Sequence, residues 1–267
     1  MRQFISQEFP DKDGIISIKE KDFRYFRQVL RAKIGDMINV RFPDSTLVQC
    51  TVCTILEKQK ILKLQICAET ENKSLTRGTT AQEIEKFLLP ELYLFAFISK
   101  PAKMELIIRQ AAECGVKFVI PVISEYSQKS SVESLSSSKK ERILKIVKEA
   151  RQQSGSPIET EVLPPQPLEN ACKMWKEQNA PGIVLYERKE NSKSLHKILK
   201  IADIKKVAIA VGSEGGISPN EISLLEKSNF FPVHFDTNIL RCETASLYGI
   251  AAVQAILLEK SEWQSTE

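Results

Sequence analysis

The feature that most limits the fold is an alternation of apolar runs of strand length with amphipathic segments of helical length, which begins at residue 92. The runs predict strands at residues 92–99, 118–124, 158–163, 182–187, 206–212 and 232–235. The spacing between them predicts helices at residues 101–115, 139–154, 171–178 and 219–228, and a final helix from Glu243. This alternation is typical of a mostly parallel sheet covered by helices on both faces. We therefore predict an α/β domain that binds ligands at the carboxyl ends of its strands.

A serine-rich stretch of low complexity, residues 127–138, interrupts this pattern. Such composition is typical of a surface loop. We expect a mobile loop here.

Residues 1–70 instead show short strands separated by turn or charged segments. We predict strands at residues 2–6, 14–18, 37–42, 46–56 and 61–69, and one short helix at residues 22–30. Several short strands in so few residues are typical of a small β-barrel or sandwich. The polar segment 69–83 is a linker candidate. We place one domain at residues 1–74 and a second at 75–267, with a linker region at 75–90.

Nothing in the sequence indicates a membrane or secretory protein. The longest uncharged stretch near the C-terminus, residues 244–258, is shorter than the roughly 18 apolar residues that a membrane helix needs. The first residues lack the apolar segment of a secretory signal. We expect a cytoplasmic protein without a membrane partner.

Metal binding is not indicated either. Cys50 and Cys53 are the only cysteines at a spacing that suggests a metal, and in an extended segment residues three apart point to opposite faces. We interpret them as two buried thiols. His196 and His234 have no partner at ligand spacing. The sequence therefore predicts no metal site.

The excess positive charge lies in the N-terminal part. Residues 1–78 hold 14 of the 38 Lys and Arg residues but only 10 of the 34 Asp and Glu residues. Its basic residues from 19 to 41 are Lys19, Lys21, Arg24, Arg27, Arg31, Lys33 and Arg41. This density suits either a nucleic-acid phosphate backbone or a solvated helix face.

The most informative segment, residues 206–225, reads as a buried strand, a glycine-rich turn and a helix. Gly212, Gly215 and Gly216 would let the backbone approach a ligand closely and leave its N–H groups free. Ser218 and Glu221 match a capping box, with Pro219 at the first helical position. We therefore assign Glu221 to the helix start rather than to a ligand.

The residues of the glycine turn do not suit a ligand that carries a polyphosphate. No lysine follows the glycines as in a Walker loop, and Glu214 inside the turn would repel phosphates. A dinucleotide fingerprint would need a different glycine spacing near the start of the domain. An adenosine compound without phosphates fits better.

A second polar cluster, residues 235–249, follows the next predicted strand. In a parallel sheet it would emerge beside the glycine turn. Arg241 offers a planar fork of donors for a carboxylate, a phosphate or the oxygens of a base. Glu243 and Thr244 suit either catalysis or helix capping.

Together these segments resemble a known family. GSEGGISPNE (212–221) and NILRCETASLYG (238–249) are similar to the late motifs of SPOUT RNA methyltransferases. VLRAKIGD (29–36), KPAKMELIIRQAAECGVKFVIPV (100–122) and EARQQSGS (149–156) narrow the resemblance to RsmE-type enzymes, which methylate N3 of a uridine in small-subunit ribosomal RNA. The chain departs from the family pattern at Ser213, where proline is usual, at Ser156, where arginine is usual, and at residues 236–238, where a glycine-containing turn is usual.

The resemblance implies an N-terminal PUA-like β-barrel that contacts RNA and a C-terminal SPOUT α/β domain with a deep trefoil knot. It further implies S-adenosylmethionine as cofactor, a homodimer, and small-subunit ribosomal RNA or the assembled small subunit as substrate. By motif, the cofactor contacts would be Leu185, Gly212, Ser213, Glu214, Gly215, Gly216, Ile239, Leu240, Arg241 and Leu247. The matching arginines Arg2 and Arg31 join Arg27 as candidates for RNA contact.

For this reaction the candidate catalytic residues are Arg241 and Glu243. Uridine N3 must lose its proton before it can attack a methyl group. Arg241 would stabilise the negative charge on the base, and Glu243 would accept the proton. Two alternatives stay open: a SPOUT methyltransferase that acts on another base or a ribose, and a non-catalytic RNA-binding protein of the same fold.

Overall fold

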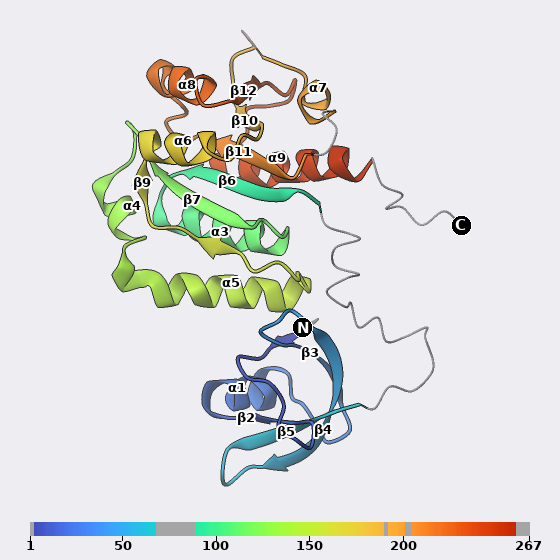
Figure 1. Cartoon of the computed structure of the whole chain (residues 1–267). Helices are drawn as coiled ribbons and strands as arrows, with labels where there is room; N and C mark the ends of the chain where they lie inside the picture. The colour runs from blue at the N-terminus through green and yellow to red at the C-terminus, as the bar shows by residue number, and fades with distance from the viewer. Residues whose placement is uncertain (1–2, 68–88, 190–191, 201–203, 260–267) are drawn as a thin grey trace. The chain divides into compact units, whose positions relative to one another are not determined.

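The computed structural model describes residues 3–67, 89–189, 192–200 and 204–259 (Figure 1). The chain divides into two compact units. The first comprises residues 1–87 together with 152–157, and the second comprises residues 88–151 and 158–267. Nearly all of the predicted linker lies outside the described residues.

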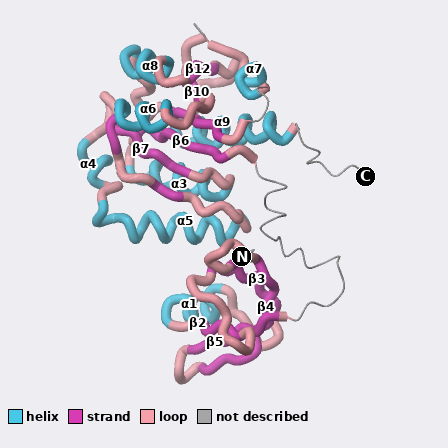
Figure 2. The backbone as a smooth tube through the Cα atoms, in the orientation of Figure 1, coloured by secondary structure: helices cyan, strands magenta, loops and turns pink. Residues whose placement is uncertain are grey.

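The N-terminal unit is built on one mixed sheet of five strands (Figure 2). The strands are β1 (Phe4–Ile5), β2 (Ile15–Ile18), β3 (Met37–Arg41), β4 (Leu47–Leu56) and β5 (Ile61–Ile66). Their order is β1-β3-β4-β5-β2, with β1 parallel to β3 and the other neighbours antiparallel. Among the described residues, no strand pairing joins the two edge strands, β1 and β2. The predicted small β unit is thus observed as a half-barrel built on one mixed sheet.

The predicted helix at residues 22–30 is split. The α-helix α1 (Glu20–Arg24) is followed by a π-helical turn, Tyr25–Val29, in which the Leu30 N–H donates to the Tyr25 carbonyl. A wider turn of this kind holds one extra residue. Phe23 in α1 and Phe26 in the π-turn are both buried in the core of the unit.

Cys53 corrects the prediction of two buried thiols. Cys50 is fully buried in β4, and burial raises the pKa of its thiol to about 12. Cys53 is exposed, at an irregularity between Val52 and Thr54 where β4 shifts register against β5. Strand alternation therefore turns the two thiols to opposite faces.

The second unit contains the predicted parallel sheet. Its strands are β6 (Glu91–Phe97), β7 (Phe118–Ile123), β8 (Glu161–Val162), β9 (Gln166–Pro167), β10 (Gly182–Leu185), β11 (Lys206–Val211) and β12 (Phe230–Val233). The order is β12-β10-β11-β6-β7-β8, β9 also pairs with β7, and every pair is parallel. The prediction of a parallel α/β domain is confirmed.

Helices cover both faces of this sheet, as the alternation of β6 requires (Figure 1). Leu92, Leu94 and Ala96 pack in one cluster with α3 (Pro101–Glu113), α5 (Lys140–Ser154), α7 (Leu195–Leu199) and α9 (Cys242–Leu258). Tyr93, Phe95 and Phe97 pack in the other with α6 (Leu168–Lys176) and α8 (Pro219–Glu226). Neighbouring β6 residues enter opposite clusters, which is the period of two expected for a strand buried on both faces.

The serine-rich stretch is not a simple loop. It contains α4 (Lys129–Glu133) and a 3₁₀ turn at Ser137–Lys139. Ser131 and Leu135 are buried, and the Ser134 hydroxyl donates to the Ser131 carbonyl. The stretch is therefore ordered by buried side chains, although its composition is typical of a mobile loop.

Candidate active site

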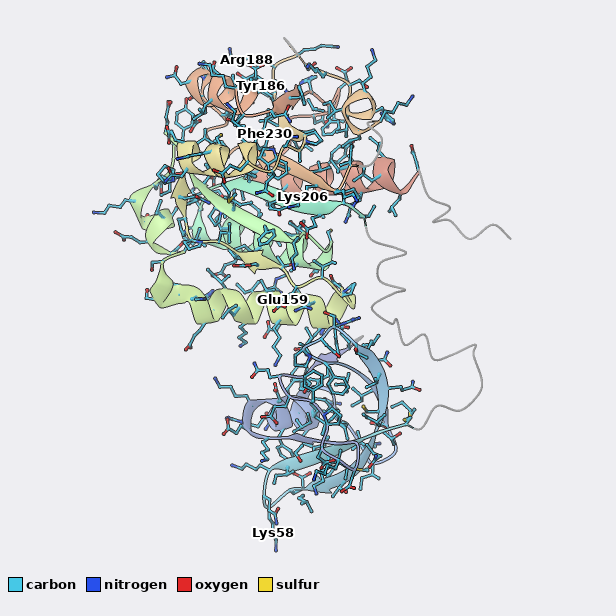
Figure 3. The ribbon with its side chains drawn as sticks, in the orientation of Figure 1. Lys58, Glu159, Tyr186, Arg188, Lys206 and Phe230 are labelled. Atoms are coloured by element: carbon cyan, nitrogen blue, oxygen red, sulfur yellow. The ribbon has the colours of Figure 1, made fainter. Side chains whose placement is uncertain are left out.

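A cavity of about 540 Å³ opens where β10, β11 and β12 end. Its wall consists of residues 185–187, 211–217, 233–235 and 237–242, together with Lys103 and Ala245. Tyr186, in the wall directly after β10, is labelled in Figure 3. These are the carboxyl ends of neighbouring parallel strands, where α/β proteins place ligands.

The structure brings together most of the residues predicted to contact a cofactor. Leu185, Ile239, Leu240, Arg241 and all residues from Gly212 to Gly216 line the cavity. Leu247, half-buried on α9, does not line it, and neither does Glu243. Lys103, Glu187 and His234 also line the cavity, although the sequence did not predict them as site residues.

The glycine loop is closed on itself, and its first glycine has no room for a side chain. Ser213 and Gly216 form an isolated antiparallel bridge, with the Gly216 N–H donating to the Ser213 carbonyl. A Cβ at Gly212 would lie 2.9 Å from the carbonyl carbon and oxygen of Gly216. Gly216 itself adopts a φ of +77°, a conformation that L side chains rarely adopt. At its glycines, this loop therefore presents only backbone atoms to the cavity.

The predicted capping box is present at the start of α8. The Ser218 hydroxyl accepts from the Glu221 N–H, and the Glu221 carboxylate accepts from the Ser218 N–H. Glu221 also accepts from the Glu125 N–H at 3.0 Å. Glu221 is thus a structural residue that anchors two loops, as the sequence predicts.

Arg241 and Glu243 occupy the start of α9. Arg241 is the N-cap residue, is exposed, and makes no side-chain hydrogen bond or ion pair within the described part of the chain. The Glu243 carboxylate accepts from its own N–H in the first turn of α9. It also lies 3.5 Å from the Lys103 ammonium and accepts from the Cys242 thiol at 3.2 Å.

Two carboxylates meet the same ammonium. Lys103 Nζ lies 3.3 Å from Glu214 Oε1, which also accepts from the Lys100 N–H at 3.3 Å. Burial raises the pKa of Glu214, but the N–H groups of Glu214 and Lys100 and the Lys103 ammonium outweigh it, so the pKa is lowered overall. The pKa of Glu243 is lowered by its own N–H, against burial, with help from the Cys242 thiol and Lys103. Both carboxylates are therefore ionised at neutral pH.

The arginines predicted to contact RNA have different surroundings in the N-terminal unit. Arg27 binds Glu57 through Nη2 at 2.6 Å and also donates to the Ala32 carbonyl, so it ties elements of its own unit together. Arg31 is exposed and has a φ of +52°. Arg41, counted among the basic residues above, is only 3% exposed and donates to Gln3. Arg2 lies outside the described residues.

Neither a metal centre nor a membrane span is found in the part of the chain that the structure describes. No group of three or more His, Cys, Asp or Glu residues there could hold a metal ion. None of the helices described is both long and apolar enough to cross a membrane.

The chain is similar in sequence to known RNA methyltransferases. The family described as "RNA methyltransferase domain" matches residues 86–254. The chain is 26% identical to the ribosomal RNA small subunit methyltransferase E of Rickettsia conorii, over 96% of this chain and 95% of the relative. It is 31% identical to the protein of the same name from Aquifex aeolicus, over 73% of this chain and 81% of the relative.

The fold is also found among solved structures. The crystal structure of a ribosomal RNA small subunit methyltransferase E from Neisseria gonorrhoeae, bound to S-adenosyl methionine, matches with a TM-score of 0.74 and 22% identity. The match covers 96% of this chain and 98% of that one. The chain belongs to the RNA methyltransferase family, and within it to the ribosomal RNA small subunit methyltransferase E group.

Proposed function

We propose that this protein is an S-adenosylmethionine-dependent methyltransferase that methylates N3 of a uridine in small-subunit ribosomal RNA. The observation that carries the proposal is the cavity at the ends of β10 to β12, whose wall includes both Arg241 and a glycine loop that itself contains no lysine. The names of the related enzymes point to the same substrate class.

The residues around the cavity suit this cofactor. Leu185, Ile239 and Leu240 offer apolar surface to an adenosine group, while the loop 212–216 offers backbone groups where a side chain at Gly212 would not fit. Glu214 is compatible with a cationic, phosphate-free ligand. S-adenosylmethionine, when bound, supplies a methyl group already activated for transfer.

The protein's own task is then to prepare the base. Glu243, which does not line the cavity itself but follows Arg241 by two residues, is the candidate acceptor of the N3 proton, and Arg241 stabilises the resulting negative charge on the base oxygens through its planar fork. N3 then forms a bond to the methyl carbon as the bond from that carbon to sulfur breaks, and sulfur keeps the electron pair. Because the pKa of Glu243 is lowered, it is a weak base, and we assign the larger share of the rate to Arg241.

Finer features of the family belong to the same proposal. The N-terminal unit would be PUA-like and contact RNA, and the C-terminal unit would carry a trefoil knot. The strand order β12-β10-β11, in which the last strand pairs with β10 rather than with β11, supports a crossing of connections there. A homodimer is supported by apolar surface on and before α9, where Ile239 is 89% and Tyr248 41% exposed. The setting would be the cytoplasm, where small subunits are assembled.

The proposal is tested with purified protein, methyl-labelled cofactor, and small-subunit ribosomal RNA both free and in assembled subunits. We expect label in one uridine, identified as the N3-methyl base by nucleoside analysis. Label on a ribose or on another base would instead support a related specificity. Failure to bind the cofactor in calorimetry would support a non-catalytic RNA-binding protein.

Arg31 provides a test of RNA contact by the N-terminal unit. We expect Arg31→Ala to weaken RNA binding and to lower its salt slope by roughly one unit, because one phosphate contact is lost. Cofactor affinity should stay unchanged. The measurement is a binding titration at several salt concentrations.

Arg27→Ala is the matched comparison, because Arg27 is already paired with Glu57. We expect it to lower the melting temperature more than Arg31→Ala does. An unchanged salt slope in Arg31→Ala would make that side chain a bystander to RNA binding.

A further inference from the structure

Lys103 occupies a position in α3 that is unfavourable for a cation. Lys100 is the N-cap residue and Pro101 the first helical residue, so Lys103 lies in the first turn, which contains no acidic residue. The partial positive charge of a helix N-terminus disfavours lysine there. Residues that break a local rule of this kind are concentrated at functional sites.

The contacts of Lys103 lie in two other elements. Its ammonium is 3.3 Å from Glu214 in the glycine loop, 3.5 Å from Glu243 in α9, and 4.0 Å from the Cys242 sulfur. The Lys103 side chain is 27% exposed, and it lines the cavity. One cation thus joins the glycine loop, residues 212–216, to the first turn of α9, which directly follows the wall segment 237–242.

We propose that Lys103 is a positioning residue for methyl transfer, which fixes Arg241 relative to the glycine loop by holding Glu214 and Glu243 together. This inference rests on the proposed function. Glu243 follows Arg241 by two residues, so the contact that holds Glu243 also holds the N-cap of α9. The loop side of the clamp is Glu214, whose neighbours Ser213 and Gly215 also line the cavity.

Loss of the ammonium would leave two carboxylates facing each other beside the cavity. Like charges repel, and the pair would be relieved by separation of the loop from α9 or by protonation of one carboxylate. Either change displaces Arg241 or the loop. A misplacement of about 1 Å can slow an enzyme roughly 100-fold.

The test compares Lys103→Met, Lys103→Gln and Lys103→Arg in single-turnover methylation at saturating cofactor. We expect the two neutral variants to melt close to wild type yet to react roughly 10- to 100-fold more slowly. Arginine, whose fork can reach both carboxylates, should recover most of the rate. Lys145→Met is the control, because Lys145 pairs with Glu149 on the exposed face of α5.

A double-mutant cycle shows whether Lys103 acts through Glu243. Because both residues belong to one contact, Lys103→Met combined with Glu243→Gln should be no slower than the slower single variant. Multiplied effects would overturn the positioning role, and so would a normal rate in both neutral variants or no recovery with arginine. An inactive wild type would overturn the proposed function and this role with it, whereas an active wild type with normal neutral variants would overturn this role alone.

Discussion

Arg241→Lys should fold and bind S-adenosylmethionine yet methylate RNA about 10²- to 10³-fold more slowly. Lysine keeps the positive charge but lacks the planar fork that can meet two base oxygens. Since Arg241 is exposed and has no partner within the described residues, its replacement should not disturb packing. Single-turnover rates at saturating cofactor measure the loss.

Arg188→Lys is the matched control, because Arg188 follows β10 near the same end of the sheet but does not line the cavity (Figure 3). It should react at the wild-type rate. If Arg241→Lys instead lost thermal stability and cofactor affinity together, with activity falling only in proportion, Arg241 would be a structural residue. Near-normal turnover at saturation would remove it from catalysis.

Gly212→Ala should abolish measurable cofactor binding, because the added Cβ meets the Gly216 backbone at 2.9 Å and backbone cannot swing aside. In Gly215→Ala, the added Cβ would clash with a side chain rather than with backbone. There the Cβ would lie 2.7 Å from the ring of Tyr126, a side chain that is 48% exposed. Calorimetric titration with S-adenosylmethionine compares the two variants.

A second substitution distinguishes a clash with backbone, at Gly212, from a clash with the Tyr126 side chain, at Gly215. Tyr126→Gly should restore binding to Gly215→Ala, because it removes both the ring and the Cβ of Tyr126, which lie 2.7 Å and 2.8 Å from the added Cβ, and should not restore it to Gly212→Ala. Wild-type affinity in a folded Gly212→Ala variant would contradict the assignment of the glycine loop to the cofactor.

The parallel sheet and its helices could be predicted because their signal is local. Tyr93, Phe95 and Phe97 alternate with Leu92, Leu94 and Ala96 within one strand, and the capping box at Ser218 needs only four consecutive residues. The glycine loop and Arg241 were found because each follows a strand, and parallel strands end at the same edge.

The contacts that could not be predicted join residues far apart in the sequence. The ammonium of Lys103 meets Glu214 and Glu243 only because α3, the glycine loop and α9 converge. Likewise, the pairing of Arg27 with Glu57 depends on how α1 and its π-turn lie against the end of β4. One signal was visible beforehand: a lysine in the first turn of a helix with no acidic residue to offset it.

The N-terminal unit is discontinuous in sequence, which matters for the design of protein fragments. Because residues 152–157 belong to that unit, its parts are separated in the chain by more than sixty residues of the other unit. The Gln3 N–H donates to the Gln152 carbonyl, and the Gln3 amide donates to the Ser156 carbonyl. A fragment that stops at residue 87 would lack both acceptors. During synthesis, likewise, the first unit cannot be completed until more than half of the chain has left the ribosome.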